Sequence, residues 1–139
     1  MHVSATGLGM SYEEFFTLHG FVKSVDPNVD LIHQGRKVAV EVKASNTADS
    51  GCAKASKLKK LAEFKRQHAD FQVVYGCVNE KKRQDPAGVD RIKVVDGVNV
   101  RYMTGELFMT FAVQSNEWKA QFRQIANAIR TFTQNFIEN

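Results

Sequence analysis

Two carboxylates and a lysine, Asp30, Glu41 and Lys43, are the residues of this chain whose types and spacing could do chemistry together. Two carboxylates a few ångströms apart repel each other unless a cation lies between them. Oxygen ligands with room for water suit Mg²⁺, and Mn²⁺ can take its place. An ion of this kind can activate water against a phosphodiester, while a neighbouring lysine orients the nucleophile or stabilises developing charge.

Glu41 and Lys43 need a strand to bring them side by side. From residue 37 to residue 44 valines alternate with other residues, which is the period of a strand with one buried face. On this prediction Val38, Val40 and Val42 point to the core. Glu41 and Lys43 then share the opposite face.

Asp30 needs a hairpin to reach them. Residues 29–33 form a second run rich in β-forming residues, and Gln34-Gly35-Arg36 carries a turn signal between it and residues 37–44. We therefore expect the two runs to pair as antiparallel strands. The pairing sets Asp30 opposite about position 40, close enough for its carboxylate to approach that of Glu41.

The pattern of Asp30 with Glu41-Val42-Lys43 resembles the PD-(D/E)xK nuclease superfamily, in which a metal-binding Asp precedes an Asp/Glu-x-Lys triplet on the next strand. The resemblance implies that Asp30 and Glu41 hold Mg²⁺, that the backbone carbonyl of Val42 adds a ligand, and that Lys43 positions or helps to activate water. It implies hydrolysis of double-stranded DNA to a 5′-phosphate and a 3′-hydroxyl. Within the superfamily the chain looks most like a type II restriction endonuclease, with a Holliday-junction resolvase or a phage or repair nuclease as the alternative.

A catalytically silent DNA-binding module is the alternative from a different class, in which the acidic residues merely pair with lysines. The triplet alone does not decide, because Glu-x-Lys also begins at Glu63, Glu80 and Glu117. Glu63 and Glu117 lie in helical patterns and Glu80 in a charged loop. Only Glu41 lies in an alternating strand with an Asp one hairpin upstream.

Further acidic residues are candidate ligands. The Pro-Asp pair of the family is absent at Asp30, but Asp26 is followed by Pro27. Glu14 or Glu13 is a candidate because nucleases of this kind often bring an acidic residue of the first helix to the metal. Ser11 and Glu14 also fit a capping box that opens a helix through about residue 18, and the cap accounts for Glu14 without any chemistry.

Several polar and basic segments could contact a phosphate backbone or could simply be solvated surface. They are the loop after the strand at 37–44, the outer face of a predicted helix at 54–69, and a charged loop at 79–88. The residues we single out as DNA-binding are Ser45, Asn46, Lys57, Lys60, Lys82 and Arg83.

The order of predicted elements is helix, three strands, helix, strand, since residues 21–25 read as a first strand and 71–78 as a buried one. A right-handed crossover places the last strand parallel to a hairpin strand. This predicts an α/β domain with a mixed central sheet flanked by helices, an αβββαβ core over about 11–78 that resembles the restriction-endonuclease core.

A C-terminal extension over about 90–139 completes the single predicted domain, 1–139. Asp96-Gly97 joins two strands in a hairpin, a short helix begins near Thr104, and residues 116–136 form a long helix. That helix carries an apolar seam, which lies either on the domain's own sheet or against a second copy in a homodimer. The seam consists of Trp118, Phe122, Ile125, Ile129, Phe132 and Phe136.

Composition predicts a soluble cytoplasmic protein with no membrane partner. The 139 residues are 43% apolar with 10 Phe, enough for one core, and lack an apolar signal core or a stretch of membrane-spanning length. The net charge of +4 favours polyanionic partners, although many proteins that bind none share it. Cys52 and Cys77 are too few for a disulfide framework, which predicts free thiols.

Overall fold

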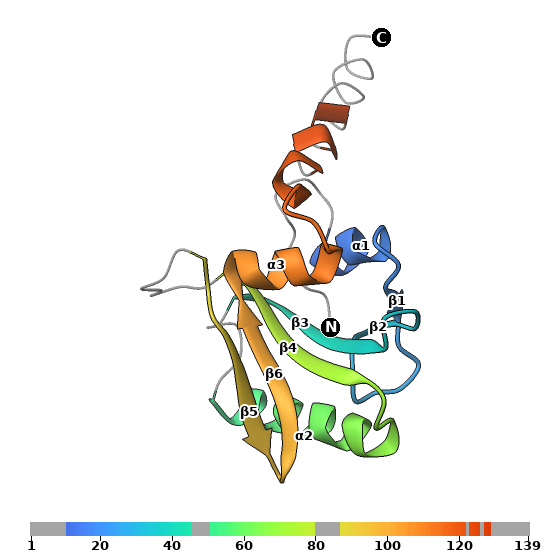
Figure 1. The fold of residues 1–139 in the computed structure, drawn as a ribbon, viewed down its shortest axis with the longest axis vertical. Helices are drawn as coiled ribbons and strands as arrows, with labels where there is room; N and C mark the ends of the chain where they lie inside the picture. The colour runs from blue at the N-terminus through green and yellow to red at the C-terminus, as the bar shows by residue number, and fades with distance from the viewer. Residues whose placement is uncertain (1–10, 46–50, 80–86, 122, 126, 129–139) are drawn as a thin grey trace.

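A computed structural model describes residues 11–45, 51–79, 87–121, 123–125 and 127–128. They form a six-stranded mixed sheet with strand order β1-β2-β3-β4-β6-β5. Helices α1 and α3 lie on one face of the sheet and α2 lies on the other (Figure 1). The prediction of a mixed α/β sheet flanked by helices is confirmed.

The first helix, α1 (Tyr12–Thr17), begins as the capping pattern predicted. The hydroxyl of Ser11 accepts a hydrogen bond from the backbone N–H of Glu14 at 3.1 Å. Two residues, β1 (Val22–Lys23), form the first strand, so the predicted strand at 21–25 is shorter than expected. The chain turns immediately afterwards, where the Asp26 carboxylate accepts from the backbone N–H of Asn28 at 2.9 Å.

The predicted hairpin is present as β2 (Leu31–His33) and β3 (Val38–Ser45), which pair antiparallel with Leu31 opposite Val40. Lys37, at the turn, has a φ of 55°. The same register, continued by one residue, sets Asp30 opposite Glu41. The expected position, about 40, was therefore right to within one residue.

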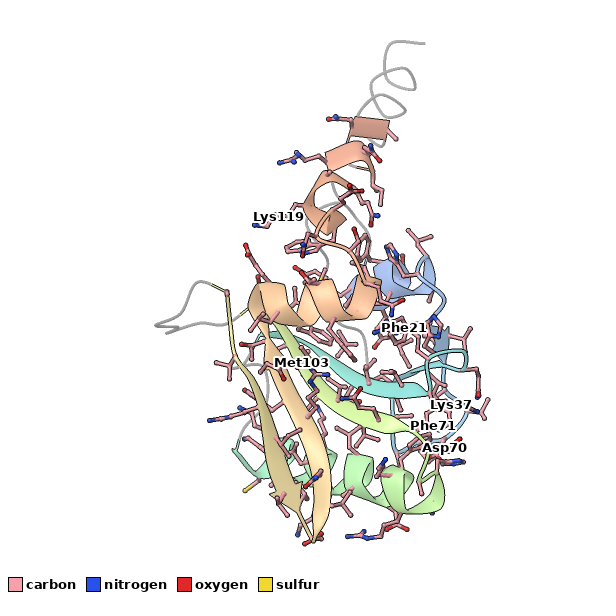
Figure 2. The ribbon with its side chains drawn as sticks, viewed as in Figure 1. Phe21, Lys37, Asp70, Phe71, Met103 and Lys119 are labelled. Carbon is pink, nitrogen blue, oxygen red and sulfur yellow. The ribbon has the colours of Figure 1, made fainter. Side chains whose placement is uncertain are left out.

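The crossover prediction is also confirmed. Helix α2 (Gly51–Gln67) leads to β4 (Gln72–Asn79), which pairs parallel with β3 and sets Glu41 beside Tyr75. Near the start of β4, the Lys37 ammonium lies 3.7 Å from the Asp70 carboxylate and 5.2 Å from the centre of the Phe71 ring (Figure 2). These contacts tie the hairpin turn to the end of α2.

The strands of the predicted extension join the same sheet. β5 (Asp90–Val95) and β6 (Val98–Thr104) pair antiparallel, and β6 runs parallel to β4. Asp96 and Gly97 between them have φ values of 51° and 78°, the positive angles that the Asp-Gly signal predicted. Helix α3 (Gly105–Val113) follows directly and is longer than the short helix expected.

The described residues between 118 and 128 are helical, in agreement with the predicted long helix. Trp118 and Ile125 pack against the core formed with α1 and α3, so this part of the apolar seam is covered by the domain itself. The other seam residues, Phe122, Ile129, Phe132 and Phe136, lie outside the described residues. The homodimer stays a prediction.

The expectation that β3 has one exposed face is wrong. Val38, Val40 and Val42 pack toward α1 and α3 as predicted, but α2 covers the opposite face. Glu41 is only 8% exposed and Lys43 only 4%. Alternation identified the two faces of the strand, but it could not show that helix α2, which begins at residue 51, covers the second one.

None of the helices in the described ranges is long and apolar enough to cross a membrane.

Candidate active site

Asp30 is fixed at the end of the hairpin by its own backbone and side chain. Its N–H donates to the carbonyl of Val40 at 3.1 Å, and its carboxylate oxygen Oδ2 accepts from the N–H of Val42 at 3.1 Å. β2 begins at Leu31, one residue after Asp30. The Asp30 carboxylate therefore accepts the Val42 N–H, which would otherwise be the next backbone donor on β3 to face this strand. This pairing holds the carboxylate beside Glu41.

Glu41 is hydrogen-bonded to Asp30 and strongly affected by its surroundings. Burial, the hydrogen bond to Asp30 and the negative charge of Asp30 raise the pKa of Glu41 from 4.5 to about 8, against the opposing effect of Lys43 and Lys57. Glu41 therefore keeps its proton at neutral pH. Two carboxyl groups are brought together here at an electrostatic cost.

Lys43 lies on the same face of β3 as Glu41, as predicted. Its Nζ is 3.7 Å from Oε1 of Glu41, and its side chain is only 5% exposed. A lysine is seldom buried unless its charge is compensated. Lys43 is thus held next to the carboxyl pair by the strand and by α2 above it.

The backbone carbonyl of Val42 is placed on the same side as Asp30. The N–H and C=O of one residue in a strand point to the same neighbour, and the Val42 N–H points to Asp30. Because β2 begins at Leu31, no strand residue of β2 pairs with Val42 in the ladder. The position fits the role of third oxygen ligand that the family resemblance implies.

The donor set fits Mg²⁺, which binds proteins through one or two carboxylates and keeps several waters. Asp30 and Glu41 supply the carboxylates, and the raised pKa of Glu41, caused first by burial and then by Asp30, reflects a cost of ionisation that a bound cation would offset. Within the described ranges no group of three or more His, Cys, Asp or Glu side chains could hold a metal ion. The predicted ligand set, with its backbone carbonyl, requires only two.

Glu14 and Asp26 are not gathered with this pair. Glu14 is exposed on α1. The Asp26 carboxylate closes a turn, and the residue lines an open hollow with His68 and Asp70 at the far end of α2. A metal-binding role for Glu14 stays a prediction without support from these contacts.

Of the predicted DNA-binding residues in the described part of the chain, Lys57 acts on the pair through its charge. It projects from α2 toward the sheet. Lys60 is exposed one turn further along α2, and Ser45 ends β3. Asn46, Lys82 and Arg83 lie outside the described residues.

A row of polar side chains that sequence reasoning missed continues from Glu41 across the sheet. Glu41 is paired with Tyr75, Tyr75 with Tyr102, and Tyr102 with Arg91, on four successive strands. The two tyrosine rings are stacked, with centres 5.6 Å apart. The only sequence signal was the strand pattern of each segment, which does not fix the register between distant strands.

Comparisons of the chain with models of protein families, with curated proteins and with solved structures found no match.

Proposed function

We propose that this protein is a metal-dependent DNA endonuclease of the PD-(D/E)xK type. The observation that carries the proposal is the hydrogen-bonded carboxyl pair of Asp30 and Glu41 beside a buried lysine, Lys43. The element order is helix, three strands, helix and strand, with Asp30 directly before the second strand and Glu41 on the third, and this is the order expected of such a core.

Asp30 and Glu41 would hold the ion, with the carbonyl of Val42 as a third ligand. A divalent ion held there supplies activation of water and neutralisation of charge at the phosphate. Mg²⁺ is the proposed ion, and Mn²⁺ can substitute for it.

Lys43 orients the attacking water and offsets negative charge that develops on the phosphate during in-line attack. This role is supported by the position of its ammonium, which β3 holds on the same face as Glu41, 3.7 Å away. Burial strengthens the electrostatic effect of its charge, since little water lies around it to screen it. The proposed products are a 5′-phosphate and a 3′-hydroxyl.

A type II restriction endonuclease acting on double-stranded DNA is the class we favour. The elements after β4, namely β5, β6 and α3, extend the sheet beyond the core and could carry recognition. A Holliday-junction resolvase or a phage or repair nuclease is the alternative within the superfamily. A homodimer would let two sites act on both strands.

One observation favours a second candidate, a catalytically silent DNA-binding module. Lys43 is paired with Glu41, and Asp30 is bonded to the backbone of Val42, so these contacts alone could account for the three residues. A cleavage assay separates the two candidates. Supercoiled plasmid, a four-way junction and single-stranded DNA are each incubated with the protein in Mg²⁺, Mn²⁺ or EDTA.

We expect metal-dependent cleavage by the wild type and none by Asp30→Asn or Glu41→Gln, since each variant removes a charge needed to hold the ion without removing core volume. The matched control is Glu63→Gln, because Glu63-Phe64-Lys65 is a second Glu-x-Lys triplet that lies in α2. It should cleave like the wild type. Full activity of both site variants would disprove the assignment, and DNA binding with no cleavage in either metal would favour the silent module.

A further inference from the structure

Three cationic side chains converge on one tyrosine ring, on the same face of the sheet as the candidate active site. The charged groups of Lys93, Arg91 and Lys54 lie 4.5, 5.1 and 5.8 Å from the centre of the Tyr102 ring. Lys93 and Arg91 come from β5, and Lys54 comes from the first turn of α2. Tyr102 is only 6% exposed, so its ring lies beneath these charges.

This grouping is electrostatically unfavourable in the protein alone. Partial burial, and then the charges of Arg91 and Lys54, lower the pKa of Lys93, while Cys77 acts weakly in the other direction. The first turn of α2 contains no acidic residue, so the positive end of the helix dipole adds to the same potential. An interaction with the face of an aromatic ring offsets part of the repulsion. A bound anion would further reduce the repulsion among the three charges.

The place of the cluster in the sheet indicates which anion. Tyr102 and Arg91 end the polar row that starts at Glu41 and passes through Tyr75. Strands are about 4.8 Å apart, so three strand spacings put Arg91 roughly 14 Å from the carboxyl pair, across the same face. Tyr75 and Tyr102 are buried under α2, so a phosphodiester chain that reaches Glu41 would not lie on the row itself. It would meet the cluster at the β5 edge of the sheet, beside the first turn of α2.

We propose that Lys54, Arg91 and Lys93, grouped at the ring of Tyr102, bind a backbone phosphate of a DNA strand a short distance from the candidate active site. This inference rests on the proposed function for the identity of its ligand, but it concerns binding and requires no cleavage. Lys54 belongs to the helical face that the sequence offered as a possible phosphate contact, whereas Arg91 and Lys93 were not singled out from the sequence.

The test is DNA binding in EDTA, where no divalent ion is present. The affinity of a fluorescein-labelled 20-base-pair duplex is measured by anisotropy at several salt concentrations for the wild type and for Lys54→Gln/Lys93→Gln. The matched control is Lys23→Gln/Lys59→Gln, which removes the same charge from exposed positions on β1 and α2. Thermal melting checks that each variant is folded.

We expect the cluster variant to bind at least about tenfold more weakly, and its slope of log affinity against log salt to fall by about 0.9 for each phosphate that is no longer neutralised. The control double variant should keep most of the affinity and most of the salt dependence. Lys54→Arg/Lys93→Arg, which retains the charges, should bind like the wild type, and this variant serves as the check if the glutamine variant does not fold.

Equal losses of affinity in the cluster and control variants would overturn the inference, as would a wild type that does not bind the duplex. Failure of the proposed function gives a different result. If the wild type binds through the cluster but never cleaves in Mg²⁺ or Mn²⁺, the nuclease proposal fails and the phosphate site stands. Cleavage with unchanged affinity in the cluster variant would overturn the phosphate site alone.

Discussion

The carboxyl groups of Asp30 and Glu41 are hydrogen-bonded to each other across the β2–β3 hairpin. A hydrogen bond between two carboxyl groups requires a proton on one of them, because ionised carboxylates only accept. The ion-free protein therefore carries near neutral pH a proton that the unfolded chain has lost. This difference makes stability, and the binding of the proposed ion, depend on pH.

The first prediction is that the ion-free protein loses stability as pH rises from about 4.5 to about 8. In the folded state the pKa of Glu41 is about 8, against 4.5 for an ordinary carboxyl group. Between these values the folded state binds more protons than the unfolded state, so each pH unit costs up to about 1.4 kcal/mol of unfolding free energy. Urea titration in EDTA at pH 5.5 and pH 8 measures the difference.

Glu41→Gln should remove most of this decline and be more stable than the wild type at pH 8, because its amide has no proton to lose. The control Glu63→Gln, on the exposed side of α2, should follow the wild type. Equal wild-type stability at the two pH values would show that the proton is not held by this pair.

The second prediction concerns the ion. Because Mg²⁺ or Mn²⁺ needs ionised ligands, binding at pH 7 must displace the proton of Glu41. We expect calorimetric titration with Mn²⁺ in buffers of different ionisation enthalpy to report release of close to one proton, and affinity to increase from pH 6 to pH 8. Asp30→Asn should abolish both effects, and a Mn²⁺ affinity that does not change with pH would contradict the assignment.

The third prediction is that replacing Lys43 reduces turnover far more than DNA affinity. The side chain is 5% exposed, so Lys43→Ala would also leave a cavity beside Glu41, and Lys43→Met is the better variant because it nearly keeps the volume. We expect cleavage to fall by roughly two orders of magnitude or more. Binding should change little, because many phosphate contacts share it.

Single-turnover cleavage of saturating DNA, together with anisotropy in EDTA, separates the two effects. Lys59→Met provides the control, since Lys59 is an exposed lysine of α2. If Lys43→Met weakened binding but turned over bound DNA at the wild-type rate, Lys43 would be a phosphate contact only.

The hairpin that carries the site could be predicted because its signals are local. Alternation in residues 37–44 and the turn after His33 were sufficient to place Asp30 near Glu41, and the Asp-Gly turn likewise gave the β5–β6 hairpin. Local periodicity and turn chemistry determine which residues of neighbouring strands face each other.

The surroundings of the site could not be predicted because they depend on contacts between distant segments. Burial of Glu41 and Lys43 follows from the packing of α2 on the sheet. Lys93 meets Tyr102 within the β5–β6 hairpin, but the contact of Lys54 with the same ring depends on the parallel pairing of β6 with β4, which neither strand specifies alone. From the helix pattern alone, Lys54 could be either solvated surface or a phosphate contact.

The fourth prediction is that Arg36→Lys destabilises the fold although it keeps the charge. The two terminal nitrogens of Arg36 donate to the carbonyls of Ala112 and Phe111 at 2.8 and 2.7 Å, at the end of α3, and the guanidinium lies 4.8 Å from the Phe111 ring centre. A lysine cannot reproduce this planar pair of donors. We expect a loss of about 1 to 3 kcal/mol by urea denaturation.

Arg123→Lys is the control for that substitution, since Arg123 is exposed on the helical segment after α3, and it should change stability by no more than about 0.5 kcal/mol. Equal effects of the two substitutions would mean that the hydrogen bonds at the end of α3 contribute nothing measurable.

The last prediction is that Gly76→Ala is destabilising because of one side chain. A Cβ at Gly76 in β4 would overlap the tip of the Phe108 ring from α3. Phe108 is fully buried and meets the Phe16 ring edge-on, so the ring has little room to move. We expect Gly76→Ala to lower the free energy of unfolding by about 1 to 3 kcal/mol, as overpacking a core does. Gly51→Ala, whose Cβ would meet nothing within 4 Å, should lower it hardly at all.

In Gly76→Ala/Phe108→Leu the smaller side chain makes room for the new methyl group, so the double variant should lose less stability than the two single variants added together. Strictly additive losses of stability would show that the two positions do not interact and that Gly76 is needed for another reason.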